Sequence, residues 1–325
     1  MRRVVGWVLA LGLLAGGMLW AFGPTEPASL KTAFEPRKFG EGIQVYFESI
    51  ESRFDDITPG AEKRVIWAGQ RETRTPVSVL YLHGFSATSE EIRPVPDKVA
   101  AALGANLVYT RLRGHGRGSA ALAEATVADW MYDLAEGLAA ARATGDRVVV
   151  LATSTGATLA AAAALDDDLS RDVAGMVLIS PNFGLADPKA RMLTWPAARW
   201  WLPLVAGRTQ SFTPVNERHE RFWTTSYPTV ALLPMGALIR AVAALDFTAA
   251  RVPVLFYLSD ADRVVRPDIS RAIAAQWGGP ATVHAVTMGE GDDPNAHVIA
   301  GDVKSPGQTE PAVAVILDWL RQQGK

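Results

Sequence analysis

The chain of 325 residues contains no cysteine, and this absence excludes disulfide bridges, thiolate metal sites and cysteine nucleophiles. Net charge is nearly absent as well: the formal value of −2 gives no electrostatic reason to expect nucleic acid as a partner. Internal repeats and low-complexity tracts are also missing from the sequence. Apolar residues, by contrast, make up 49% of the chain, which is enough to bury a sizeable core in one large domain or two medium ones.

Charged residues are missing from the run Val4–Phe22, which follows Arg2 and Arg3. Its 19 residues would span roughly 28 Å as a helix, close to the thickness of a bilayer core. Residues 1–23 are therefore interpreted as an N-terminal membrane anchor or as a signal peptide. Both interpretations export the rest of the chain, which is either anchored to the membrane by this helix or secreted or periplasmic after cleavage. A buried helix of a soluble protein is the third interpretation.

Past a Pro-, Ser- and Thr-rich linker at residues 24–39, the chain from residue 40 to 325 alternates between apolar runs and helical patterns. Near-continuous apolar runs predict five buried strands, at residues 77–82, 106–111, 147–152, 175–180 and 252–258. A sixth strand is predicted at 281–288, and helices are predicted at 126–142, at 157–165 and after Thr309. This alternation predicts an α/β fold with a mostly parallel sheet flanked by helices.

One segment, at about residues 185–245, interrupts the alternation because it has no strand pattern. It holds four of the ten tryptophans, which are Trp195, Trp200, Trp201 and Trp223. Because it lies between the predicted strands that end at Ser180 and start at Val252, we interpret it as a helical cap inserted above the sheet. The alternative is that it forms one or two ordinary core helices.

The candidate nucleophile is Ser154, which follows an apolar strand and precedes a helix of small residues. A nucleophilic serine in such a strand-to-helix turn has an exposed hydroxyl, and the residues two positions before and after it must be small. Ala152 and Gly156 meet that condition, although glycine is commoner at the position of Ala152. An ordinary β–α turn is the alternative interpretation.

Acyl transfer at Ser154 needs two backbone N–H donors for the developing oxyanion. One is expected from Thr155, the residue after the nucleophile. The other is expected from Phe85, in the turn that follows the strand ending in His83-Gly84. His83 itself is expected to be a structural hydrogen-bonding residue rather than an acid or base.

The candidate base is found by elimination among the five histidines. In enzymes with this type of nucleophile the acid follows the serine and the histidine comes last, so only His284 and His297 lie late enough. His284 falls inside a predicted strand, whereas His297 lies in a loop before the last helix, where a base can hang over Ser154. The alternatives are a solvent-exposed loop histidine and a metal loop formed with the acids at 290–293.

The acid that orients the base should follow the penultimate strand. Asp260 and Asp262 both lie there, directly after residues 252–258. Asp262 stands farther out along the turn and is the candidate, because this carboxylate must reach the imidazole N–H and accept it. Asp260 is interpreted as a turn-forming residue.

With these residues in place, the chain resembles the capped α/β-hydrolases grouped as monoacylglycerol lipases, lysophospholipases and serine aminopeptidase-like enzymes. The resemblance covers about residues 75–323 and rests on Leu82-His-Gly-Phe85, Arg113-Gly-His-Gly-Arg-Gly-Ser119, Ala152-Thr-Ser-Thr-Gly156, Ser259-Asp-Ala-Asp-Arg-Val-Val265 and His297. It implies that Ser154, Asp262 and His297 form a catalytic triad. It also implies that Phe85 and Thr155 supply the oxyanion amides, and that His115 belongs to a structural loop.

The resemblance implies a serine carboxylic-ester hydrolase that acts through an acyl-enzyme on Ser154 and needs no cofactor. Because aromatic residues line apolar pockets well, the cap favours lipid-like monoesters of the monoacylglycerol or lysophospholipid type. Serine at the nucleophile position argues against haloalkane dehalogenase and epoxide hydrolase chemistry. Two alternatives stay open: an acyltransferase on the same fold, and a non-catalytic, membrane-tethered binding protein.

Overall fold

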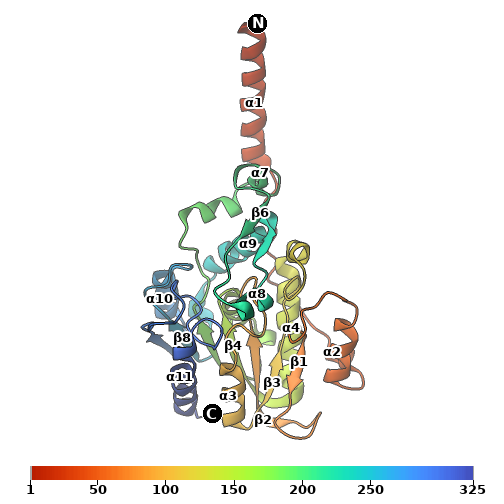
Figure 1. Ribbon diagram of the computed structural model, residues 1–325, viewed down its shortest axis with the longest axis vertical. Helices are drawn as coiled ribbons and strands as arrows, with labels where there is room; N and C mark the ends of the chain where they lie inside the picture. The colour runs from red at the N-terminus through yellow and green to blue at the C-terminus, as the bar shows by residue number, and fades with distance from the viewer. Residues whose placement is uncertain (1, 325) are drawn as a thin grey trace.

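The computed structural model describes residues 2–324, and its body is built around a seven-stranded sheet (Figure 1). The strand order is β1-β3-β2-β4-β5-β8-β9, and all neighbours are parallel except the antiparallel pair β1 and β3. The strands are β1 (Arg64–Ile66), β2 (Thr75–Leu82), β3 (Asn106–Tyr109), β4 (Gly145–Thr153), β5 (Val173–Ile179), β8 (Val254–Leu258) and β9 (Ala281–Ala285). The predicted mostly parallel sheet is confirmed. The three-residue strand β1 was not predicted, because it contains no apolar run.

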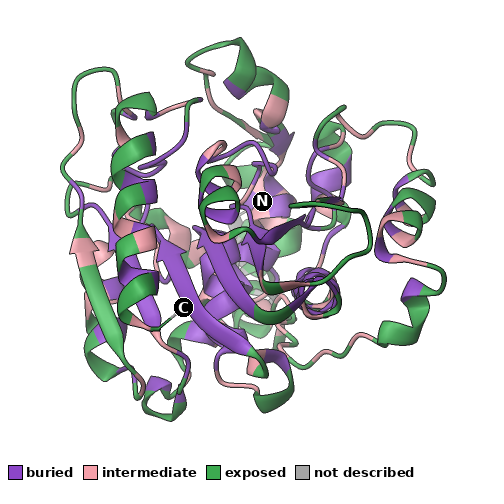
Figure 2. Ribbon diagram, turned by 90° about the horizontal axis from the view of Figure 1, so that it is seen from below, coloured by how far each residue is buried: buried purple, intermediate pink, exposed green. Residues whose placement is uncertain are grey.

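Helices cover both faces of the sheet, so its inner strands are buried, whereas the edge strand β9 is largely exposed (Figure 2). Successive residues of β2 alternate between two cores: Leu80 and Leu82 join the first, Val79 and Tyr81 the second. Near-continuous apolar strands are what such double coverage requires. The first core is completed by α4 (Val127–Thr144), α5 (Thr155–Ala163), α9 (Leu232–Ala243) and α10 (Pro267–Gln276), and the second by α3 (Val95–Leu103) and α11 (Thr309–Gln322).

Helix α4 shows how the sequence sets an element boundary. The Thr126 side chain accepts the Asp129 N–H at 3.2 Å, and the Asp129 carboxylate accepts the Thr126 N–H at 2.9 Å. This reciprocal capping box satisfies two backbone donors that the first turn would otherwise leave without partners. It fixes the start of α4 directly after Thr126, the residue at which the predicted helix begins.

The insertion between β5 and β8 forms a cap at the carboxyl end of the sheet, the end from which α1 projects (Figure 1). It contains a 3₁₀ helix (Pro188–Thr194), α7 (Ala198–Val205), β6 (Thr209–Ser211), α8 (Glu217–Phe222) and β7 (Ser226–Pro228), and it ends in α9. The expectation of a segment without strands is wrong, because β6 and β7 pair antiparallel. Three-residue strands are too short to show an alternating pattern. Helix α9 packs against α4 and α5, so the end of the insertion belongs to the core layer.

Helix α1 (Arg2–Phe22) projects from the body (Figure 1). Within the described part of the chain, no helix combines the length and the apolar content needed to span a membrane, so the anchor predicted for residues 1–23 is not supported here.

The segment predicted as a linker, residues 24–39, is docked rather than free. The Pro24 carbonyl accepts the Ala197 N–H at 2.6 Å, and Glu26 pairs with Arg199 of α7 at 2.7 Å. Farther along, Phe34 packs edge-on against Tyr132 of α4, with ring centroids 5.7 Å apart. The linker therefore connects the cap to the body along the surface of the protein.

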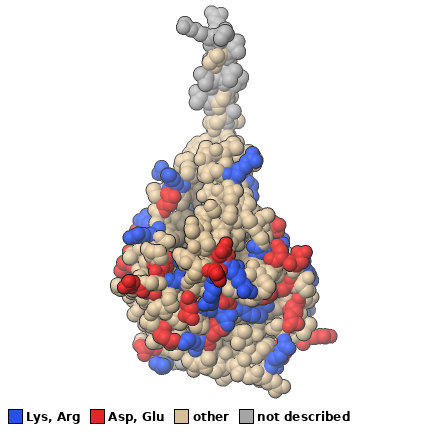
Figure 3. Space-filling view, in the orientation of Figure 1, with Lys and Arg blue, Asp and Glu red and all other residues tan. Residues whose placement is uncertain are grey.

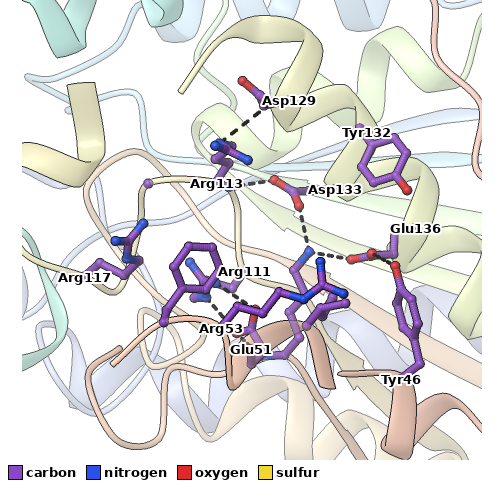
Figure 4. Close-up of a pocket in the computed structure, with 14 residues that line it drawn as sticks. Tyr46, Glu51, Arg53, Arg111, Arg113, Arg117, Asp129, Tyr132, Asp133 and Glu136 are labelled. Carbon is purple, nitrogen blue, oxygen red and sulfur yellow. Dashed lines mark hydrogen bonds and ion pairs between the residues drawn. The ribbon is translucent and has the colours of Figure 1, made fainter. Parts of the chain in front are cut away.

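Charged side chains of both signs are interspersed over the face shown in Figure 3. A few lie inside the protein, around a cavity of about 250 Å³ between α2 (Ile43–Glu51), α4 and the loop 111–117 (Figure 4). We call it the charged cavity and define it by Glu51, Lys63, Arg111, Asp133 and Glu136.

Each charge of the charged cavity meets an opposite one. The Lys63 ammonium contacts Asp133 at 2.7 Å and also Glu136, and Arg111 binds both oxygens of Glu51 at 2.7 Å. Burial lowers the pKa of Lys63, but the two carboxylates more than reverse this, so the pKa is raised and the ammonium stays charged. The Arg111–Glu51 pair holds the loop 111–117, which contains the sequence motif around His115, against α2. The Arg113 N–H, which donates to Asp133 at 2.6 Å, holds the same loop against α4.

Candidate active site

Ser154 occupies a strained turn between β4 and α5. Its φ of 50° and ψ of −114° lie in a region that residues other than glycine rarely adopt. The turn is held by hydrogen bonds on both sides: Ser154 N–H donates to the Ile179 carbonyl at 2.9 Å, and Asn182 N–H donates to the Ser154 carbonyl at 3.2 Å. A side chain at Gly156 would put its Cβ 2.6 Å from two carbonyl oxygens of the neighbouring strand, so only glycine fits there.

The structure brings together the three side chains predicted to form a triad. His297 Nε2 lies 3.1 Å from Ser154 Oγ, and His297 Nδ1 lies 2.8 Å from Asp262 Oδ2. The other carboxylate oxygen of Asp262 accepts the N–H groups of Val264 and Val265, at 2.8 and 2.9 Å, which aims Oδ2 at the imidazole.

Asp260, which the sequence analysis interpreted as a turn-forming residue, lies apart from this chain of hydrogen bonds. Both oxygens of Asp260 bind Arg271 at 2.8 Å, and the pair is exposed. The geometry thus separates the two candidates, with Asp262 next to the imidazole and Asp260 in a surface ion pair.

Burial and charge act in opposite directions on His297. Burial lowers the pKa of the imidazole, and the charge of Asp262 together with its hydrogen bond reverses this, so the pKa is raised above the ordinary value of 6.5. The charges of Glu91 and Asp293 act in the same direction as Asp262. The imidazole is therefore a stronger base than an isolated histidine, as proton removal from a serine hydroxyl requires.

Asp293 shapes the loop that carries His297. From the sequence it was named only as part of a possible metal loop. Its Oδ2 accepts the N–H groups of His297 and Val298 at 3.2 and 2.9 Å. Its Oδ1 pairs with Lys304 at 3.2 Å. Within the described residues, no group of three or more potential ligands is arranged to hold a metal ion. Asp293 is a loop-forming residue whose partners, backbone amides, leave no recognisable signal in the sequence.

The two amides expected to bind the oxyanion have no hydrogen-bond partner within the described residues. Thr155 is the first residue of α5, so its N–H has no intrahelical acceptor and lies at the positive end of the helix dipole. The Gly84 carbonyl, in the peptide before Phe85, is bound by the Ala87 N–H at 3.3 Å and lies 2.9 Å from His83 Nδ1. Because carbonyl and N–H point in opposite directions across a trans peptide, this fixes the direction of the Phe85 N–H.

The remaining histidines lie away from the triad. His83 Nε2 accepts the Leu112 N–H at 3.1 Å, and burial lowers the pKa of His83 to about 4, so this imidazole stays neutral. His115 is buried beside it, with ring centroids 5.0 Å apart. His284 of β9 stacks on Tyr257 of β8. His219 lies buried in α8 of the cap.

Part of the cap touches the loop that carries Phe85. The rings of Phe85 and Tyr227 are 5.4 Å apart, and Thr224 N–H donates to the Ser86 carbonyl at 2.7 Å. The aromatic residues of the cap thus divide into two groups. Tyr227 and Trp223 lie near the candidate site, whereas Trp200 is 59% exposed on α7.

Comparison with known proteins agrees with this geometry. The model of the alpha/beta hydrolase family matches residues 79–299, which include Ser154, Asp262 and His297. A thermostable monoacylglycerol lipase from Bacillus sp. (strain H-257) is 28% identical over 193 residues, covering 59% of this chain and 73% of the relative.

Solved structures share the fold at low sequence identity. A structure from a study of the metagenome-derived lipolytic enzymes LipS and LipT has a TM-score of 0.64 at 19% identity, covering 82% of this chain and 99% of the other. A soluble variant of monoglyceride lipase from Saccharomyces cerevisiae, solved with a substrate analogue, has a TM-score of 0.58 at 13% identity, covering 82% and 92%. The family match spans more than half of the sequence, and the chain belongs to the alpha/beta hydrolase family.

Proposed function

We propose that the protein is a serine hydrolase that cleaves carboxylic esters through an acyl-enzyme on Ser154. The observation that carries the proposal is the unbroken hydrogen-bonded chain from Ser154 Oγ through His297 to Asp262. It gives the hydroxyl proton a place to go as the oxygen attacks a carbonyl carbon. Asp262 stabilises the imidazolium that then forms.

The reaction proceeds in two halves. Ser154 Oγ attacks the ester carbonyl, His297 takes the proton, and the N–H groups of Phe85 and Thr155 stabilise the tetrahedral oxyanion. As the intermediate collapses, the C–O bond to the alcohol breaks and His297 protonates the leaving oxygen. Water then attacks the acyl carbonyl carbon with His297 as base. The bond to Ser154 Oγ breaks, His297 returns the proton to Oγ, and the carboxylic acid leaves.

The substrate class is proposed to be lipid-like monoesters. Two observations support it: aromatic residues of the cap, Trp223 and Tyr227, lie near the candidate site, and the Bacillus relative is a monoacylglycerol lipase. Each methylene buried against such a surface stabilises binding by about 0.8 kcal/mol until the pocket is full.

Two measurements test the proposal together. Wild-type protein should react covalently with a fluorophosphonate probe, and its kcat/KM should rise with acyl length across p-nitrophenyl esters from acetate to octanoate before it levels off. Absence of probe labelling would contradict the serine mechanism. A flat chain-length profile would contradict the acyl pocket and leave the mechanism intact.

Export of the chain beyond residue 23 stays a prediction. A mature protein that starts near residue 24, identified by mass spectrometry of the protein from its native host, would support signal cleavage. Recovery of the full chain from the cytoplasm would contradict export.

A further inference from the structure

We propose that Glu91 is a positioning residue for the proposed ester cleavage, which holds the loop of Phe85 in register with Ser154 and His297. We call residues 83–87 the oxyanion loop. Glu91 lies in the segment that follows the oxyanion loop and is 2% exposed. Nothing in the sequence motifs marks it.

Glu91 binds the oxyanion loop directly. Its Oε2 accepts the N–H of Gly84 at 2.7 Å, one residue before the proposed oxyanion donor. A Cβ built on Gly84 would lie 2.7 Å from Glu91 Oε1 and 3.0 Å from Ser154 Cβ. The carboxylate and the nucleophile therefore both lie against Gly84, on the side to which a Cβ would point.

The same carboxylate oxygen is connected to the nucleophile turn through a tyrosine. Tyr81, at the end of β2, donates its hydroxyl to Glu91 Oε2 at 3.0 Å. The Tyr81 oxygen lies 3.1 Å from the Thr153 hydroxyl, which can donate to it, and Thr153 immediately precedes Ser154. The sheet already pairs the strand that carries the oxyanion loop with the strand that carries the serine, and Glu91 adds a side-chain connection between this pair and the oxyanion loop.

The backbone beside Glu91 supports the histidine loop as well. Ile92 packs against Gly301 so closely that an added Cβ on this glycine would lie 2.4 Å from Ile92 Cα. Arg93 accepts the Asp302 N–H at 2.9 Å. The segment 91–93 therefore contacts the oxyanion loop and the residues that follow His297 directly, and it reaches the nucleophile turn through Tyr81.

Stability alone gives no reason for a charge at this position. A buried carboxylate without a direct cationic partner destabilises the folded state. The described residues provide Glu91 with no ion pair, because the nearby Lys304 binds Asp293 instead. Burial raises the pKa of Glu91, and the Gly84 hydrogen bond and the charges of His297 and Lys304 oppose this.

The experiment compares Glu91→Ala, Glu91→Gln and Tyr81→Phe with wild type on p-nitrophenyl acetate. Removal of the carboxylate in Glu91→Ala should lower kcat about 10- to 100-fold, less than the loss of an oxyanion donor itself, with little change in KM. Glu91→Gln should keep most of kcat because its amide oxygen still accepts the Gly84 N–H. Tyr81→Phe should lower kcat by a smaller factor than Glu91→Ala.

A pH profile separates positioning from a merely structural role. The charges that face His297 come from Asp262, Asp293 and Glu91, and only the last is removed in Glu91→Gln. Since a negative neighbour raises the pKa of the imidazole, the acid limb of kcat/KM should move to lower pH in this variant. Rates are expressed per mole of fluorophosphonate-reactive protein, so that loss of folded protein does not count as loss of turnover.

The matched control is Glu90→Gln, an adjacent buried acid whose ion pairs go to Arg64, Arg93 and Arg218 rather than to the oxyanion loop. It should keep wild-type kcat and the wild-type acid limb. A wild-type kcat in Glu91→Ala, or an unmoved acid limb in Glu91→Gln, overturns the proposal. If Glu91→Ala does not fold, the acid limb of Glu91→Gln decides alone. Failure of the proposed function would show separately, as wild-type protein that the probe does not label.

Discussion

Buried charge serves two regions of this protein in opposite ways. In the charged cavity every carboxylate faces a cation, as Lys63 faces Asp133 and Glu136. In the candidate active site the carboxylate of Asp262 faces an imidazole, which in turn faces a hydroxyl. The first arrangement pairs each charge with an opposite one, so it does not favour proton transfer between the groups. The second lines up a hydroxyl, an imidazole and a carboxylate, so that the hydroxyl proton can pass to Nε2 while the carboxylate holds the N–H at Nδ1. The following predictions test this difference.

The largest effect is expected from Ser154→Ala. Removal of Oγ breaks the line of atoms at its reactive end, so kcat on p-nitrophenyl esters should fall by a factor on the order of 10⁴–10⁶. Covalent labelling by a fluorophosphonate should disappear, while circular dichroism stays that of wild type. Full labelling of this variant would show that another residue is the nucleophile.

The next effect distinguishes the two neighbouring acids. Asp262→Asn replaces the acceptor oxygen with an amide that cannot both accept the imidazole N–H and keep its backbone partners, so kcat should fall by about 10⁴. Asp260→Asn only breaks an exposed pair with Arg271, and kcat should stay within about twofold of wild type. The reverse order of the two kcat values would identify Asp260 as the acid.

In the charged cavity the expected effect is on stability. Lys63→Met leaves Asp133 and Glu136 buried without their cation, and the free energy of unfolding in urea should fall by about 3–5 kcal/mol. Turnover per folded molecule should not change. The control is Arg71→Met, whose exposed pair with Glu48 at 3.6 Å contributes at most about 1 kcal/mol. Equal destabilisation by both variants would mean that burial of the Lys63 pairs adds nothing.

The smallest effect is a displaced pH profile. His297 must be neutral to accept the serine proton, and its pKa is raised above 6.5. The protonated, inactive form therefore persists to higher pH than for an isolated histidine, and kcat/KM should rise with a midpoint above pH 6.5. A midpoint at or below that value, measured with a substrate that does not ionise, would mean that burial outweighs Asp262.

The sequence predicted the features that depend on local pattern. Apolar runs identified five strands of the sheet, a sixth strand was predicted at 281–288, and small residues around Ser154 indicated the strand-to-helix turn. Chain order led to Asp262 and His297, which the structure places within hydrogen-bond distance of each other and of Ser154 in turn. Loops at the same edge of a parallel sheet meet there, so order along the chain carries spatial information.

Other features depend on contacts that no local pattern records. The hairpin of β6 and β7 is too short for an alternating pattern, and its strands face each other only after the cap has folded. Glu91 and Asp293 act on backbone amides, and any acidic residue in a loop has the same appearance in the sequence. The 24–39 segment has the composition of a linker because its docking uses few side chains, among them Glu26 and Phe34.

The docking of residues 24–39 has a mechanical consequence. Pro24 and Glu26 contact α7 of the cap, and Phe34 contacts α4 of the body. Residues 24–39 therefore form a strap, which is a second link between cap and body besides the chain segments that join the cap to β5 and β8. A load that lifts the cap must also stretch or peel the strap. Shortened forms of the protein should therefore begin at Pro24 to keep the cap under its native restraint, and a form that begins after Phe39 should melt at a lower temperature.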